Sequence, residues 1–176
     1  MKTKDMTLTA VAAALICVAG PMVIPVGPVP LSLATFAVYL AGAVLGRKRG
    51  TLAVALYLLI GIVGAPVFSG FSGGFQKLAG VTGGYLAGYL PCAYFTGLGA
   101  ERMEKEGRRW LLPVMAAVGT AVLYTVGTAW FMIQTGNGFG AALGLCVLPF
   151  LPGDAAKIAA AAVLAAPVRK AAAGII

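Results

Sequence analysis

Residues 6–46 read MTLTAVAAALICVAGPMVIPVGPVPLSLATFAVYLAGAVLG and contain no charged side chain. A membrane-spanning helix needs about 20 predominantly apolar residues, so this stretch is long enough for two of them. Its middle, PVGPVP at residues 25–30, cannot continue a helix, because proline lacks a backbone N–H and clashes with the preceding turn. The stretch therefore predicts two membrane helices, over residues 6–24 and 31–46, joined by a proline-rich turn.

Three further runs without charge follow, at residues 50–76, 78–100 and 110–153. By the same length criterion they predict four more helices. We expect these at residues 50–64, 81–100, 110–133 and 150–168. The predicted fold class is an all-α integral membrane protein, a six-transmembrane-helix bundle that forms a single domain over residues 1–176.

The composition supports this class and narrows the chemistry. Apolar residues make up 60% of the chain and charged residues 10%, whereas soluble domains average about half apolar and a quarter charged. The sequence has no histidine and only five acidic residues. This excludes histidine general bases, Ser–His nucleophile pairs and most zinc and haem sites. We therefore expect no catalytic residue and no metal site.

The basic residues are concentrated between or beside the apolar runs. Eleven of the thirteen lie in four clusters: Lys2 and Lys4; Arg47, Lys48 and Arg49; Arg102, Lys105, Arg108 and Arg109; and Arg169 and Lys170. This distribution is the positive-inside pattern of membrane proteins rather than a nucleic-acid-binding face. It predicts that both termini and the segments 47–49 and 101–109 are cytoplasmic.

Three connections then face outward, at about residues 25–30, 65–80 and 134–149. They are rich in proline or glycine, and irregular backbone at membrane depth survives only where protein buries it or water reaches it. We interpret them as a lid or the wall of a cavity, with plain exposed loops as the alternative.

The N-terminal segment has a second interpretation. Lys2 and Lys4 followed by an apolar run resemble a secretory signal peptide. The run 6–24 is longer than the usual apolar region of such a peptide, and no small-residue cleavage site precedes a polar start. We therefore expect the first helix to stay in the mature protein.

Three charged residues fall outside the cytoplasmic clusters, namely Lys77, Asp154 and Lys157. Asp154 and Lys157 are three residues apart, so they share one face of a helix. Ionisable groups inside a membrane span usually face the bundle interior or a wet cavity. We interpret the pair as part of a polar substrate site just below the outer surface. The alternative is an ion pair that satisfies itself and caps the last helix.

Lys77 leaves one unbalanced positive charge on the outer side, because the other two charges cancel. Such a site suits a small monoanion that also carries neutral hydrogen-bonding groups. The nearby polar candidates are Ser69, Ser72, Gln76, Thr82, Tyr85 and Asn137, and Phe68, Phe71 and Phe75 are candidates for an apolar wall.

The chain contains no G-x-x-x-x-G-K-[ST] loop to hold nucleotide phosphates. If it moves a solute uphill, another subunit must hydrolyse the ATP. Ala10 and Ala14 form a small-xxx-small pattern on the first helix, which lets a partner helix approach closely.

Three segments together resemble the BioY family, the biotin-specific S components of energy-coupling factor (ECF) vitamin transporters. They are PVGPVPLSLATFAVYLAGAVLG at 25–46, GAPVFSGFSGGFQKLAGVTGGYLAGY at 64–89 and LPFLPGDAAK at 148–157. The resemblance implies a six-helix bundle of the S-component type in the plasma membrane, with biotin held near its outer end. It also implies a membrane T component and two cytoplasmic ATPases as partners, and no cofactor.

Individual residues carry the resemblance unevenly. Ala10 and Ala14 match the motif with which such S components dock on the T component, and Asp154 and Lys157 match the family's polar pair. Many relatives carry Thr-x-Gln where Ser32 and Ala34 stand, which weakens the case for a ligand role at the start of the second helix. Val81 replaces a proline of the family pattern and leaves Thr82 and Tyr85 in place.

The chemistry of biotin agrees with these residues. Its ureido ring presents two N–H donors and a carbonyl, and its tail ends in a carboxylate. An ionised Asp154 only accepts hydrogen bonds, and Lys157 only donates them; which end of biotin meets which residue stays open. The predicted function is high-affinity biotin capture without catalysis. The alternatives are an S component for another vitamin, a small intramembrane enzyme and a passive pore.

Overall fold

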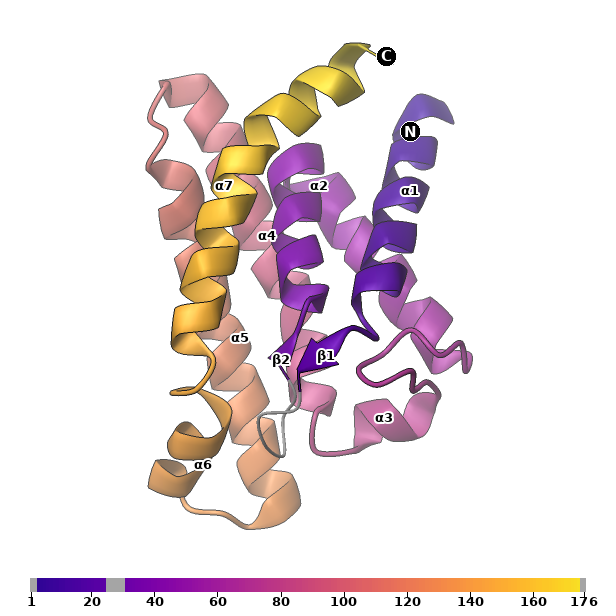
Figure 1. Ribbon diagram of the computed structural model, residues 1–176, viewed down its shortest axis with the longest axis vertical. Coiled ribbons are helices and arrows are strands. Elements are labelled where there is room, and N and C mark those ends of the chain that lie inside the picture. Colours follow the sequence, from indigo (N-terminus) through magenta and orange to yellow (C-terminus); the bar gives the residue numbers. More distant parts are fainter. Residues whose placement is uncertain (1–2, 25–30, 175–176) are drawn as a thin grey trace.

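The computed structural model describes residues 3–24 and 31–174 as a bundle of helices with one two-residue strand pair (Figure 1). The elements in chain order are α1 (Thr3–Ala19), β1 (Val23–Ile24), β2 (Leu31–Ser32), α2 (Ala34–Ile62), α3 (Phe75–Ala79), α4 (Gly83–Glu106), α5 (Leu111–Thr135), α6 (Phe139–Cys146) and α7 (Leu151–Gly174). The strands pair antiparallel, with Val23 opposite Ser32. The expected all-α class is confirmed, and the proline-rich turn expected at 25–30 lies outside the described residues.

Helix α2 consists of two arms that meet at a kink. Gly46 has φ +77° and ψ 176°, a conformation that glycine adopts without the steric cost of a side chain. The backbone N–H of Arg47, just after the kink, donates to Glu101 Oε1 on α4 at 2.9 Å. The boundary expected in the basic segment 47–49 therefore falls at Gly46, and the basic residues open the second arm instead of forming a loop.

The start of α1, the end of α7 and the segments 47–49 and 101–109 gather at one end of the bundle, the top in Figure 1. Ion pairs tie the helices together there. Arg49 lies 2.6 Å from Asp5, and Arg169 pairs with Glu104 while its Nε donates to the Val44 carbonyl at 3.2 Å. Four of the acidic residues thus offset part of the positive charge at this end.

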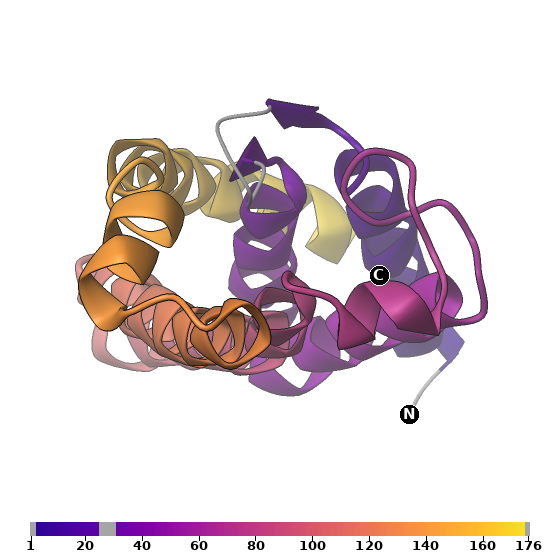
Figure 2. The same ribbon diagram turned by 90° about the horizontal axis from the view of Figure 1, so that it is seen from below.

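The opposite end carries α3, α6 and the strand pair around its rim (Figure 2). The alternative of a plain exposed loop over 134–149 is wrong, because Phe139–Cys146 is helical. Its glycines suggested a loop, but Ala142 and Cys146 are one turn apart and fully buried. Burial of that apolar face outweighs the low helix propensity of the glycines.

The core lies between α2, α4 and α5. Glycines let α4 and α5 approach closely, since a Cβ added at Gly127 would come within 2.3 Å of the Tyr85 ring. Beside them, Phe68 packs edge-to-face on Tyr57 with ring centroids 5.5 Å apart. Phe68 therefore anchors the connection between α2 and α3 to the bundle.

Among the described residues, two helices are long and apolar enough to cross a membrane by length and composition, over Leu111–Thr135 and Leu151–Ala171. The other helices are less clear candidates. Helix α1 has 17 residues, α2 is broken at Gly46, and the last two turns of α4 carry charged side chains. The expectation of six spanning helices goes beyond this test.

Candidate ligand-binding site

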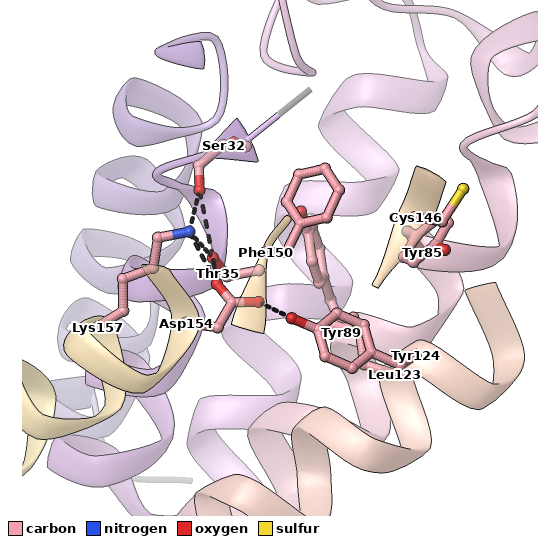
Figure 3. A pocket seen from close by; sticks show the side chains of 10 residues that line it. All are labelled: Ser32, Thr35, Tyr85, Tyr89, Leu123, Tyr124, Cys146, Phe150, Asp154 and Lys157. Carbon is pink, nitrogen blue, oxygen red and sulfur yellow. Dashed lines mark hydrogen bonds and ion pairs between the residues drawn. The ribbon is translucent and has the colours of Figure 1, made fainter. Parts of the chain in front are cut away.

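The ion pair between Asp154 and Lys157 lies inside the helix bundle (Figure 3). Lys157 Nζ is 2.9 Å from Asp154 Oδ1, and the two side chains are only 11% and 6% exposed, respectively. Both residues are on α7 and three positions apart, so they point to the same side of that helix. Burial makes the pair expensive to break, since removing one partner of a buried pair costs about 3–5 kcal/mol.

Lys157 uses all three of its ammonium hydrogens within the chain. Besides Asp154, it donates to the Ser32 carbonyl and to Thr35 Oγ1, each at 2.8 Å. A lysine has three N–H donors and no acceptor. Lys157 therefore ties α7 to the start of α2 and has no hydrogen left for a ligand in this arrangement.

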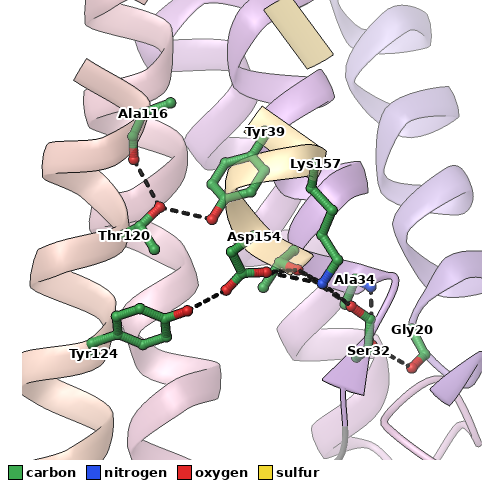
Figure 4. Close-up of polar contacts among 10 residues, drawn as sticks. Gly20, Ser32, Ala34, Tyr39, Ala116, Thr120, Tyr124, Asp154 and Lys157 are labelled. Atoms are coloured by element: carbon green, nitrogen blue, oxygen red, sulfur yellow. Dashed lines mark hydrogen bonds and ion pairs between the residues drawn. The ribbon is translucent and has the colours of Figure 1, made fainter. Parts of the chain in front are cut away.

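Asp154 is held from three sides (Figure 4). Tyr124 on α5 donates to its Oδ2 at 2.6 Å, while Oδ1 accepts from Lys157 and lies 3.4 Å from Thr35 Oγ1. A carboxylate offers about four acceptor positions, so Oδ2 keeps one for a ligand.

The alternative of an ion pair that satisfies itself and caps the last helix holds in its first half, because Lys157 pairs with Asp154 in the first turn of α7. The cap itself is not made through a side-chain hydrogen bond in the described part of the chain. Helix α7 begins at Leu151, and the Asp154 backbone N–H already donates to the Phe150 carbonyl at 2.8 Å. Within the described residues, the carboxylate bonds to side chains of α2, α5 and α7 and to no backbone N–H.

A pocket opens beside this network, walled by five helices (α2, α4, α5, α6 and α7), by strand β2 and by the connection between α6 and α7. Its lining residues are Ser32, Thr35, Tyr85, Tyr89, Leu123, Tyr124, Cys146, Phe150, Asp154 and Lys157. It combines aromatic walls with one buried charge pair, which is the usual character of a small-molecule site. Deeper in the bundle, Tyr39 and Thr120 bond to each other at 2.7 Å.

A second pocket lies on the other side of Tyr85 and Tyr89. It is lined by Phe68, Ser69, Lys77, Thr82, Tyr85, Leu86 and Tyr89. Of the expected residues, the structure thus brings Asp154, Lys157 and Tyr85 to the first pocket. The second pocket receives Phe68, Ser69, Lys77, Thr82 and again Tyr85.

Five other expected residues line neither of these two pockets, namely Ser72, Gln76, Asn137, Phe71 and Phe75. Gln76 is exposed on α3, and Asn137 is exposed and bonds to Thr135. Phe71 and Phe75 are 73% and 67% exposed, so the apolar wall expected from three phenylalanines reduces to Phe68.

Sequence reasoning missed the start of α2. Ser32 and Thr35 line the pocket and accept from Lys157, although the departure from Thr-x-Gln argued against a role there. The Ser32 contact uses its backbone carbonyl, so it does not depend on the side chain. Tyr89 and Tyr124 were missed as well, because a tyrosine within an apolar run gives no signal of a site.

Comparison with known proteins identifies the chain. The BioY family model matches residues 1–174. The chain belongs to the BioY family. The resemblance in the sequence is thereby confirmed.

BioY relatives match over nearly their whole length. The probable biotin transporter BioY of Pyrococcus horikoshii is 39% identical, over 94% of this chain and 96% of the relative. The biotin transporter BioY of Thermotoga maritima is 41% identical, over 89% and 90%. A crystal structure of the S-component for biotin from an ECF-type ABC transporter superposes with a TM-score of 0.87 at 28% identity, covering 96% of this chain and 92% of that one. BioY proteins are thus membrane transporters, and this chain is a membrane protein of that family.

Proposed function

We propose that this chain is the S component of an ECF transporter, which captures biotin and serves its uptake. The observation that carries the proposal is the buried acceptor Asp154, with one free lone pair, inside an aromatic pocket of a BioY protein. Biotin's ureido N–H groups are suitable donors for that carboxylate. Lys157 holds Asp154 in position, while Tyr85, Thr82 and Lys77 line the remaining surface.

The alternatives are less well supported. BioY relatives that match this chain are named biotin transporters, which favours biotin over another vitamin. An intramembrane enzyme would need a general base or a bound metal. No cofactor is part of the proposal, and biotin is the transported ligand.

The test is equilibrium binding of labelled biotin to the detergent-purified chain alone. We expect saturable binding of one biotin per chain, displaced by unlabelled biotin and not by thiamine or riboflavin. Displacement by another vitamin would assign the chain to a different substrate. Absence of saturable binding would remove the capture function altogether.

We further propose that a membrane T component and two cytoplasmic ATPases complete the transporter. Ala10 and Ala14 support a docking face on α1, because both are exposed while Ala13 and Ile16 of the same helix are buried against the bundle. Small residues on an exposed helix face permit close helix–helix contact.

Replacing both Ala10 and Ala14 with tryptophan is expected to abolish co-purification with the T component and ATP-driven biotin uptake. Biotin affinity of the isolated chain should not change, because neither residue lines the two pockets. Val163→Trp, at a 73% exposed position of α7, is the matched control for bulk alone. A normal complex with both tryptophans in place would locate the docking face elsewhere.

We propose six membrane spans, with both termini and the basic end in the cytoplasm. Single cysteines at Lys48 and Asn137, both exposed, test this orientation in a background without native cysteines. An impermeant thiol reagent applied to intact cells should label position 137 and not position 48. Labelling of position 48 from outside contradicts the six-span topology, and permeabilised cells show that both sites react.

A further inference from the structure

An apolar groove lies between α1 and α7 at the basic end of the bundle, and both helices pack on α2, which forms its floor. The lining residues are four of α1 between Leu8 and Leu15, five of α2 between Ala37 and Leu45, and Val168 of α7. All ten are apolar. On α1 and α2 they follow the i, i+3, i+4, i+7 pattern, which places them on one face of each helix. Figure 1 shows α2 running between α7 and α1 at this end.

The groove is narrow and opens to the side of the bundle. Val11 and Leu15 on its rim are 51% and 57% exposed, whereas Ala41 on its floor is only 5% exposed. The cavity volume is about 130 Å³. An apolar cavity of about 150 Å³ can hold a molecule of benzene, whereas an α-helix about 10 Å across is too wide to enter a space of this size. The groove therefore fits a slim hydrocarbon.

The length of the groove matches part of one membrane leaflet. From Leu8 to Leu15, the α1 wall spans about 10 Å along the helix axis. Half of a membrane's hydrocarbon core is about 15 Å thick. A hydrocarbon chain that enters from the basic end thus stays within the leaflet on that side.

The groove is distinct from the face of α1 that carries Ala10 and Ala14. Neither alanine lines it. With 3.6 residues per turn, the two alanines point roughly 130° away from the middle of the row that runs from Leu8 to Leu15. A partner helix seated on Ala10 and Ala14 therefore leaves the groove itself to another occupant.

Arg169 lies at the basic end of the groove. It follows Val168, and its Nε donates to the carbonyl of Val44, which is also a lining residue, at 3.2 Å. Its Nη1 pairs with Glu104. Arginine has five N–H donors, so three of them have no partner among the described residues. The planar guanidinium suits a phosphate group, which it can bind with two parallel hydrogen bonds.

The charge around the groove favours an anionic occupant. Within the described residues, the start of α1, the end of α7 and the segments 47–49 and 101–109 carry ten basic residues and four acidic ones. Each of the four acidic residues is already paired with an arginine. Basic surfaces at the membrane boundary attract anionic lipid headgroups.

We infer that the groove holds one acyl chain of an anionic phospholipid, whose phosphate binds Arg169. The acyl chain covers the apolar floor on α2, while the headgroup stays level with the basic end of the bundle. A single molecule thereby uses both the hydrocarbon groove and the unpartnered N–H donors of Arg169. This lipid site goes beyond the proposed function and does not depend on biotin.

The experiment counts the lipids bound to the purified chain by native mass spectrometry in an uncharged detergent. We expect one phosphatidylglycerol per chain, bound roughly 5-fold more tightly than phosphatidylcholine with the same acyl chains, because only phosphatidylglycerol has a net negative charge. Soluble glycerol phosphate should not displace it, since it has no chain to enter the groove.

Variants separate the headgroup from the chain. Arg169→Met should abolish the preference for phosphatidylglycerol and leave phosphatidylcholine binding unchanged. Ala37→Phe should weaken both lipids roughly 10-fold or more, because its ring fills the floor and displaces several CH₂ groups of the chain. Ala12→Phe makes the same test from the α1 wall, and the melting temperature shows which variants are folded.

Two matched controls exclude unspecific effects. Arg109→Met removes an exposed cation from the same end of the bundle, on the connection between α4 and α5, which does not line the groove. Ala121→Phe adds the same bulk at an exposed position of α5. Neither should change the binding of either lipid.

The inference is overturned if the wild-type chain binds both lipids equally, if Arg169→Met keeps the preference, or if folded Ala37→Phe and Ala12→Phe chains bind lipid normally. A wild-type chain that binds no lipid but forms a dimer, lost in Ala12→Phe, would assign the groove to a second copy. Unchanged lipid binding in Ala37→Phe with loss of the T component would assign it to that partner. Whether the chain binds biotin affects none of these outcomes.

Discussion

Asp154→Asn is expected to weaken biotin binding roughly 30- to 1,000-fold. The amide presents a donor where the ligand N–H needs an acceptor, and it leaves a buried group unpaired. Together these effects cost about 2–4 kcal/mol, which corresponds to the stated change in dissociation constant. The measurement is biotin affinity of the purified variant, with the ligand-free melting temperature recorded beside it.

The melting temperature is needed because Asp154 also has a structural role. Its loss leaves the Lys157 ammonium buried with only neutral acceptors, Ser32 O and Thr35 Oγ1. The double variant Asp154→Asn/Lys157→Met removes both charges and should recover part of the lost stability, since neutral replacements of a buried pair are better tolerated than one unpaired charge. It should not recover affinity. If affinity returns together with stability, Asp154 acts through folding and not through the ligand.

Lys157→Met is expected to give the second large effect, a loss of biotin affinity of similar size together with a lower melting temperature. Methionine keeps most of the apolar stem, but Asp154 loses its cation and Ser32 and Thr35 lose their link to α7.

The control for Lys157→Met is Lys170→Met on the same helix, at an exposed position whose side chain makes no hydrogen bond or ion pair among the described residues. It should leave both affinity and melting temperature unchanged. A folded Lys157→Met protein with normal biotin affinity contradicts the positioning role and removes this end of α7 from the site.

The sequence by itself determined the class of the protein. A chain with 60% apolar and 10% charged residues has too little polar surface for a soluble fold, and the resemblance of three segments named the family. It also pointed to Asp154 and Lys157, because rare charges in an apolar helix stand out and a spacing of three residues places them together.

The tertiary structure alone decided which other residues complete the site. Thr35 and Tyr124 contact Asp154 across 119 and 30 residues of chain, and Tyr89 joins them from α4. The 3.6-residue period of an α-helix predicts which residues of one helix are neighbours. Contacts between two helices depend on how deep each helix lies in the bundle and on its rotation about its own axis. Those two quantities follow from packing, such as the close approach of α4 and α5 at Gly127. Serine, threonine and tyrosine within apolar spans therefore gained their roles only when the helices were placed together.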